Sequence, residues 1–144
     1  LRFVRDAQAE GATLAIGGAR ILPETGGWYM APAILTGVAP HHRLFREEVF
    51  GPVLAVTPFT VEAEAIRLAN ATDYGLAAGV WTSDLGRAHR MIRALRAGVV
   101  HVNTYGGADG TVPLASTRQS GNGADKSLHA LDKYTDLKTA WIQL

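Results

Sequence analysis

Residues 53–59, Val-Leu-Ala-Val-Thr-Pro-Phe, form the first strand of the segment that decides the fold. A helix with Thr60 as its expected N-cap follows, and then a second strand at residues 76–81, which is apolar throughout and expected to be covered on both faces. A second helix, capped by Ser83 or Asp84, and a third strand at residues 99–103 come next. Short connections between these elements predict right-handed crossovers and a parallel sheet. We therefore expect an α/β fold.

The flanking sequence adds shorter elements to this layer. Residues 1–10 read as a helix whose beginning has been cut away and whose apolar side carries Leu1, Val4 and Ala7. Residues 12–16 and 33–35 read as strands. A glycine-rich and proline-rich loop separates those two strands. A short helix at residues 125–131 precedes a terminal strand at residues 137–144, which needs a partner sheet.

Composition narrows the classes of protein. The chain has 144 residues, 47% of them hydrophobic, and a formal charge of +1. This size and composition suit one soluble domain, and the charge gives no positive field for a nucleic acid. No apolar run is long enough for a membrane span and no signal peptide is visible, so we expect a cytoplasmic protein. The absence of cysteine excludes disulfides, thiolate metal sites and a thiol nucleophile within these residues.

A Gly-Pro turn lies just ahead of the first strand and follows two carboxylates and an aromatic ring. Gly51 permits backbone angles closed to other residues, and Pro52 fixes its own φ. We therefore expect a stiff loop that presents Glu48 and Phe50. On residue pattern alone, solvated carboxylates and a core phenylalanine are the simpler interpretation.

Ligands of an open parallel sheet bind beyond the carboxyl ends of its strands. The segment at residues 104–124 follows the third strand and lacks periodicity, so we expect it to be a functional loop. No glycine-rich dinucleotide fingerprint, phosphate loop or paired metal-binding histidines occur in the chain. The histidines are scattered, and His41 and His42 point different ways, so we expect no metal site.

Several blocks together resemble the C-terminal part of the aldehyde dehydrogenase superfamily. These blocks are residues 47–53 (Glu-Glu-Val-Phe-Gly-Pro-Val), 69–82, 97–103 (Ala-Gly-Val-Val-His-Val-Asn) and 119–123 (Gln-Ser-Gly-Asn-Gly), with a weaker likeness at 26–35. The resemblance implies a three-layer, open, mainly parallel α/β sheet of the aldehyde dehydrogenase type, incomplete in this fragment. Residues 1–136 would belong to the catalytic domain and residues 137–144 to a terminal oligomerisation strand.

The resemblance also implies roles for the loop before the first strand. In the family, the glutamate at the position of Glu48 binds the nicotinamide ribose hydroxyls of NAD or NADP, and Phe50 would pack beside the nicotinamide ring. A carboxylate suits a ribose diol because its two oxygens accept two hydrogen bonds. Glu47 is expected to remain a solvated carboxylate.

The family oxidises aldehydes by thiolate attack, hydride transfer to NAD or NADP and hydrolysis of a thioester. Its nucleophile, general base and oxyanion asparagine belong upstream of the matching region. No catalytic residue is therefore expected in this chain, which should not oxidise an aldehyde alone.

The loop at residues 104–124 corresponds to the family's substrate-tunnel loop. The expected substrate-binding residues are Asn103, Tyr105, Asp109 and Leu114. Ordinary exposed loop positions are an equal interpretation for Tyr105 and Asp109. Asp125 matches an acidic residue of the family pattern, but capping of the helix after it explains it equally well.

Residues 114–118 depart from the family's Phe-Gly-Gly-x-Lys pattern and read Leu-Ala-Ser-Thr-Arg. Loss of two glycines is expected to remove positive φ angles, and loss of the Phe ring removes part of a pocket wall. Two compensating frame shifts in the coding sequence would produce the same pattern, and the nucleotide sequence distinguishes them from divergence.

Residues 111–113 and 119–134 resemble the branch that acts on amino-substituted aldehydes, including γ-glutamylamino-butanal and guanidinobutanal. Asp109 would then meet a cationic or amide-bearing tail. The terminal strand resembles one that joins a neighbouring subunit, which implies a homo-oligomer, either a dimer or a tetramer. The alternative is a non-catalytic assembly fragment of the same fold.

Overall fold

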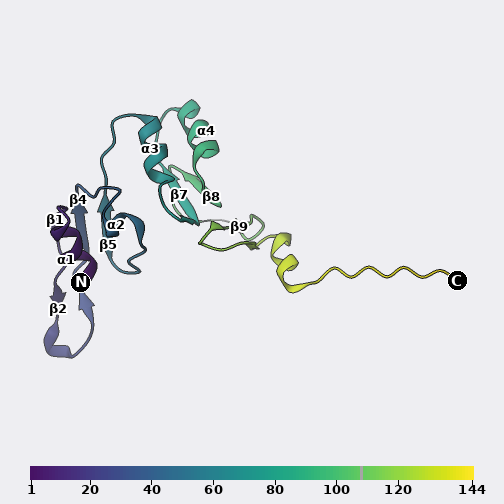
Figure 1. Ribbon diagram of the computed structural model, residues 1–144, viewed down its shortest axis with the longest axis horizontal. Helices are drawn as coiled ribbons and strands as arrows, with labels where there is room; N and C mark the ends of the chain where they lie inside the picture. The colour runs from purple at the N-terminus through teal and green to yellow at the C-terminus, as the bar shows by residue number, and fades with distance from the viewer. Residues whose placement is uncertain (108) are drawn as a thin grey trace. The chain divides into compact units, whose positions relative to one another are not determined.

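The computed structural model of the chain describes residues 1–107 and 109–144. The loop expected at residues 104–124 contains residue 108, which lies outside the described residues. Two compact units, residues 1–72 and 73–144, make up the chain. Each unit is a small α/β assembly, and the α-helices and the longer strands are labelled in Figure 1.

The first unit is built on a three-stranded sheet with the order β1-β4-β5 (Figure 1). Strand β1 (Thr13–Ile16) runs antiparallel to β4 (Ala33–Thr36), and β4 runs parallel to β5 (Val53–Val56). Helices α1 (Arg2–Ala9) and α2 (Arg43–Arg46) pack their apolar side chains with β4. The buried cluster that results contains Val4, Ala7, Ala12, Ala33, Leu35, Val38 and Leu44.

The helix predicted for residues 1–10 is confirmed as α1, and its buried side chains, Val4 and Ala7, are two of the three expected on its apolar side. The third, Leu1, is exposed. The segment between β1 and β4, expected to be a loop, instead contains a small hairpin. Its strands are β2 (Arg20–Ile21) and β3 (Tyr29–Met30), joined through the 3₁₀ helix η1 (Pro23–Thr25).

Helix α3 (Glu62–Ala69) closes the first unit. The sequence predicted Thr60 as its N-cap, but the cap residue is Val61. Glu64 instead reaches back and accepts hydrogen bonds from the Thr60 amide and hydroxyl, both at 2.9 Å. These bonds lower the pKa of Glu64 because they stabilise the carboxylate.

The second unit contains the parallel pair β7 (Ala77–Val80) and β8 (Val99–Val102), joined through α4 (Leu85–Ala94). Asp84 caps α4, as one of the two predicted caps, by accepting a 2.9 Å hydrogen bond from the Arg87 amide. That bond lowers the pKa of the Asp84 carboxyl. The βαβ unit expected between residues 76 and 103 is therefore confirmed.

Short antiparallel pairs complete the second unit. Strand β6 (Tyr74–Gly75) pairs with β10 (Thr117–Arg118), and β9 (Leu114–Ala115) pairs with β11 (Ala124–Asp125). The helix expected at residues 125–131 is the 3₁₀ helix η2 (Leu128–Tyr134). The following residues, 135–144, form no helix or strand, so the expected terminal strand does not form in this chain.

The single parallel sheet and its three layers are not formed by the described residues. Strand β5 pairs only with β4, and β7 pairs only with β8, so these strands belong to separate small sheets. Residues 76–81 were also expected to be covered on both faces, yet Leu76 and Trp81 are exposed. None of the helices in the described ranges is long and apolar enough to cross a lipid bilayer.

Candidate functional site

The loop at residues 47–52 connects α2 to β5. The Glu47 amide donates to the Arg43 carbonyl at 3.0 Å, which ends α2. At the other end, the Pro52 carbonyl accepts a 2.8 Å hydrogen bond from the Ala33 amide of β4. The loop is therefore held to helix and sheet at its two ends, which leaves residues 48–51 between fixed points.

The two neighbouring glutamates have different surroundings. Both Nε and Nη2 of Arg43 lie 2.9 Å from Oε2 of Glu47. This pairing lowers the pKa of Glu47 and raises the pKa of Arg43. Glu47 is thus an exposed carboxylate, as the sequence predicted, but it is also the ion-pair partner of Arg43. Glu48 is exposed and has no hydrogen-bond or ion-pair partner among the described residues.

Phe50 carries the unusual backbone angle of this loop. Its φ is +49°, whereas Gly51, to which the sequence assigned that freedom, is not among the residues with positive φ. A left-handed conformation costs a residue other than glycine on the order of 1–3 kcal/mol. The Phe50 side chain is 93% exposed, so burial of the ring in this chain does not offset that cost. Phe50 is not the core residue of the simpler interpretation.

Asn103, predicted as the last residue of the third strand, lies directly after β8, and its backbone amide continues the β7–β8 ladder. Oδ1 accepts from the Thr82 amide and Nδ2 donates to the Thr82 carbonyl, both at 2.8 Å. The Asn103 amide also donates to the Val80 carbonyl at 2.8 Å. Asn103 therefore fixes the ends of two strands and the start of the loop that follows them.

Tyr105 and Asp109 lie on that loop. The Tyr105 side chain is 78% exposed, and its ring centroid lies 5.7 Å from that of His101. Asp109 accepts hydrogen bonds at Oδ1 from the Thr111 amide at 2.8 Å and from the Thr111 hydroxyl at 2.9 Å. These two bonds, together with the nearby charge of Lys126, lower the pKa of Asp109. Its carboxylate therefore stays ionised at neutral pH.

Leu114 is half-buried and pairs through its backbone with Asp125, in the β9–β11 ladder. The departure from the family pattern at residues 114–118 does not prevent this ladder. Ala115 and Ser116 stand where the family has glycines, and neither has a positive φ. The expected conformational cost of losing the two glycines is therefore absent, and the positive φ in this stretch belongs to Arg118 instead.

Two glycines of the second unit lie against this stretch. A Cβ on Gly98 would lie 2.1 Å from the carbonyl oxygen of Ala115, and a Cβ on Gly75 would lie 2.3 Å from Oγ1 of Thr117. The Ser120 hydroxyl also accepts a 3.0 Å hydrogen bond from the Gly75 amide. Residues 115–120 are thus positioned by close backbone approach, which depends on glycine at positions 75 and 98.

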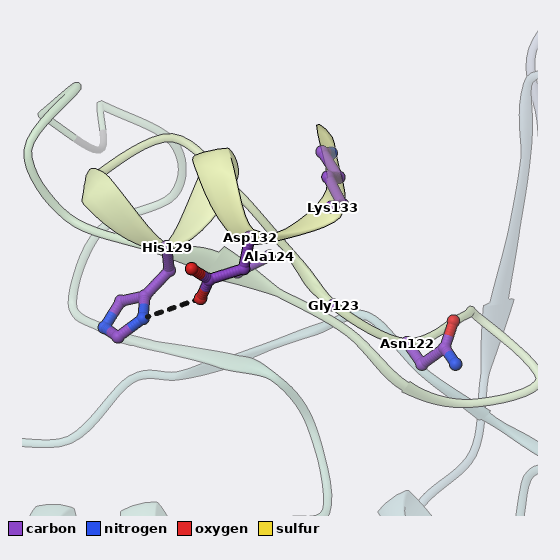
Figure 2. A pocket seen from close by; sticks show the side chains of 6 residues that line it. All are labelled: Asn122, Gly123, Ala124, His129, Asp132 and Lys133. Carbon is purple, nitrogen blue, oxygen red and sulfur yellow. Dashed lines mark ion pairs between the residues drawn. The ribbon is translucent and has the colours of Figure 1, made fainter. Parts of the chain in front are cut away.

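An open hollow of about 460 Å³ lies beside β11 and η2 (Figure 2). Figure 2 shows the His129 ring and the Asp132 carboxylate facing each other, with 3.8 Å between Nδ1 and Oδ2. Lys133 bonds to Asp125, which raises the pKa of the lysine. The charged side chains that line the hollow are therefore largely paired with other residues of the second unit. Its lining residues are Asn122, Gly123, Ala124, His129, Asp132 and Lys133.

The structure groups the predicted residues into two sets. Glu48 and Phe50 share one loop of the first unit, and Asn103, Tyr105, Asp109 and Leu114 belong to the second unit. No group of three His, Asp or Glu side chains in residues 1–107 and 109–144 is placed to hold a metal ion. Sequence reasoning missed Arg43, the partner of Glu47. Its i, i+4 spacing to Glu47 was the available signal.

Comparison with known proteins identifies the family. The profile described as "Aldehyde dehydrogenase family" matches residues 1–140. The chain is 53% identical over 142 residues to the NADP/NAD-dependent aldehyde dehydrogenase PuuC of Escherichia coli (strain K12), covering 99% of this chain and 28% of that protein. The chain belongs to the aldehyde dehydrogenase family.

Two further relatives extend this comparison. The aminoacetaldehyde dehydrogenase of Pseudomonas aeruginosa is 46% identical over 141 residues, covering 97% of this chain and 28% of that protein. An indole-3-acetaldehyde dehydrogenase solved in complex with NAD+ superposes with a TM-score of 0.93 at 54% identity, covering 99% of this chain and 29% of that structure. The chain therefore spans less than a third of the length of these relatives.

Proposed function

We propose that this chain is part of an NAD(P)-dependent aldehyde dehydrogenase and that Glu48 and Phe50 bind the nicotinamide-ribose half of the cofactor. The supporting observation is the difference between the two glutamates. Glu47 is paired with Arg43, whereas Glu48 is exposed and unpaired two residues from the exposed ring of Phe50. A free carboxylate beside an apolar ring fits a ribose diol joined to an aromatic base.

The proposed reaction converts an aldehyde to a carboxylic acid. When bound, NAD or NADP accepts a hydride from the substrate carbon. In this chain, Glu48 holds the ribose hydroxyls and Phe50 limits the orientation of the ring. The chain contains no cysteine, so the thiolate that attacks the aldehyde in this family comes from sequence outside these 144 residues.

Titration with NAD+ tests the role of Glu48. Glu48→Gln keeps the shape of the side chain but removes its charge, and hydrogen bonds to charged groups are stronger than neutral ones. We expect about tenfold weaker binding for Glu48→Gln and a change of less than about twofold for Glu47→Gln. The measurement is the NAD+ dependence of the backbone amide shifts of residues 48–50. Equal effects of the two variants contradict the assignment of the ribose to Glu48.

An assembly role is the second candidate function. It is supported by exposed apolar side chains at the end of the chain, at Leu137, Trp141, Ile142 and Leu144. Residues 137–144 would then form a strand only against a second copy, in a dimer or tetramer. Size measurement during the same titration separates the two functions, because oligomers without NAD+ affinity favour assembly alone.

We infer further that the strands of this chain belong to a three-layer, open, mainly parallel sheet. Apolar side chains on or beside the parallel strands are exposed, including Leu54, Leu76 and Trp81. Burial of such side chains is favourable, at about 25 cal/mol per Å² of apolar surface. The rest of an aldehyde dehydrogenase domain would cover them. In the same arrangement, residues 1–136 belong to the catalytic domain and residues 137–144 to the oligomerisation strand.

The second unit would contribute the substrate tunnel. Asn103 holds the start of the loop through Thr82, and Tyr105, Asp109 and Leu114 would line the tunnel. The carboxylate of Asp109 is ionised and accepts from Thr111 at Oδ1, and its negative charge would suit a cationic or amide-bearing aldehyde. A similar protein from Pseudomonas aeruginosa is named for an amino-substituted aldehyde, which supports this substrate class.

Replacement of Asp109 by asparagine tests the substrate class in an enzyme that contains this chain. Asparagine retains an oxygen acceptor for Thr111 but carries no charge. We expect KM for cationic aldehydes to rise by up to about fivefold, because an exposed ion pair contributes up to about 1 kcal/mol. KM for neutral aldehydes should change by less than about twofold. Equal changes for both classes would exclude charge recognition by Asp109.

A further inference from the structure

Among the described residues, His42 is the one polar side chain that is buried, with only 3% of its surface exposed. Its Nδ1 accepts a 3.1 Å hydrogen bond from the backbone amide of Ala39. Because a backbone amide can only donate, Nδ1 must carry a lone pair and the imidazole must be neutral in this contact. The neighbouring His41 is exposed and presents its ring edge-on at 4.4 Å.

Two hydrogen bonds between Ala39 and His42 close the turn that these residues form. In addition to the imidazole contact, the His42 amide donates to the Ala39 carbonyl at 2.9 Å. The preceding residue, Val38, is anchored to the end of β5, since its amide donates to the Val56 carbonyl at 3.1 Å and its carbonyl accepts from the Thr57 hydroxyl at 2.7 Å. The imidazole therefore joins a turn that is fixed to the sheet.

This turn sets the start of α2. The His42 carbonyl accepts a 3.1 Å hydrogen bond from the Phe45 amide, and Nε of Arg46 donates back to the Pro40 carbonyl at 2.8 Å. A helix of four residues is too short to be stable by itself. Its direction must come from its anchors outside the helix, which are this turn and the contact of Arg43 with Asp6 of α1.

We propose that His42 is a positioning residue for the loop that presents Glu48. The neutral imidazole holds the Ala39 amide, the closed turn aims α2, and α2 ends at the residue before Glu47. Without the acceptor at Nδ1, the partly buried Ala39 amide loses its hydrogen-bond partner and the turn loses one of its two closing bonds. The role of the loop in cofactor binding rests on the proposed function, but the order of the loop does not.

Amide hydrogen exchange of the 144-residue chain tests this proposal. His42→Leu removes the acceptor with similar volume, and roughly tenfold faster exchange is expected at Ala39, Phe45 and Glu47. His42→Asn places an acceptor oxygen on Cγ, where Nδ1 is attached in histidine, and should restore exchange to within about threefold of the wild type. Leu35, in β4, serves as the control for an intact core and should not change.

Two outcomes would overturn the proposal. One is unchanged exchange at Ala39 and Glu47 in His42→Leu, and the other is failure of His42→Asn to restore it while Leu35 stays protected. If His42→Leu does not fold, His42→Gln replaces it, because its amide lies one bond farther from the backbone than that of asparagine. Equal exchange in the Asn and Gln variants then overturns the proposal.

Titration with NAD+ separates this inference from the proposed function. If both hold, His42→Leu weakens NAD+ binding about fivefold or more and His42→Asn does not. If the proposed function is wrong, the wild-type chain does not bind NAD+, yet the exchange pattern of the variants is unchanged. If His42 does not position the loop, NAD+ binds equally well to the wild type and to His42→Leu.

Discussion

Gly98→Ala is expected to displace residues 115–117 and to destabilise the second unit by about 1–3 kcal/mol or more. The added Cβ would lie 2.1 Å from the Ala115 carbonyl oxygen and 2.4 Å from its carbon. Atoms of a backbone cannot rotate away as the end of a side chain can, so a whole segment must move. Segment 115–117 is also held by Gly75 through β6 and β10, which limits the movement that could relieve the clash.

Hydrogen exchange at Gly75 and Gln119 measures this displacement, since these amides donate to the Ser120 hydroxyl and the Asp73 carbonyl, both at 3.0 Å. Both should exchange faster in Gly98→Ala. Gly110→Ala is the matched control, because a Cβ at Gly110 meets no atom within 4 Å. Its stability should stay within about 0.5 kcal/mol of the wild type. Unchanged exchange in Gly98→Ala would show that the segment does not depend on close approach to Gly98.

The same geometry explains why the unusual sequence at residues 114–118 still forms strands. Backbone pairing uses amide and carbonyl groups that every residue except proline provides. Sequence reasoning assigned the conformational freedom of this stretch to the missing glycines, but Ala115 and Ser116 need none. The glycines that this stretch does require, Gly75 and Gly98, belong to other elements. Only the folded arrangement reveals that dependence.

Local elements were predicted well because local signals specify them. Helix α4, its Asp84 cap and the strands on either side follow from periodicity and from capping chemistry. The hairpin of β2 and β3 was missed because its strands have two residues each and lie among glycines and prolines. Two residues are too few for an alternating pattern, so nothing in that stretch distinguishes a hairpin from a loop.

Elements that need a distant partner were predicted poorly. Residues 137–144 pair with no sheet edge of this chain, so they form no strand by themselves, and their pairing with a second copy stays a prediction. For the site, the sequence and its family resemblance selected Glu48. They could not show that Glu47 forms an ion pair with Arg43. Nor could it show which of His41 and His42 is buried, since adjacency alone says only that they differ.

The purified 144-residue chain is expected to produce no NADH from any aldehyde. Direct hydride transfer from an aldehyde would leave an acylium-like carbon, and the family avoids this by first adding a thiolate to the carbonyl. The chain has no cysteine, so that addition has no nucleophile within it. Correct placement of Glu48 and Phe50 does not replace the missing step, because a group that orients the cofactor contributes only when there is a bound adduct to oxidise.

Absorbance at the NADH band, followed with short neutral aldehydes and amino-substituted aldehydes, measures this outcome. The Escherichia coli relative is the positive control for the assay, since it is an aldehyde dehydrogenase 53% identical to this chain over the shared residues. NADH formation by the chain that depends on aldehyde would contradict the prediction and require a nucleophile other than cysteine. NAD+ binding is measured separately by the titration of residues 48–50. If the chain binds NAD+ but forms no NADH, its contribution to the reaction is to bind and orient the cofactor.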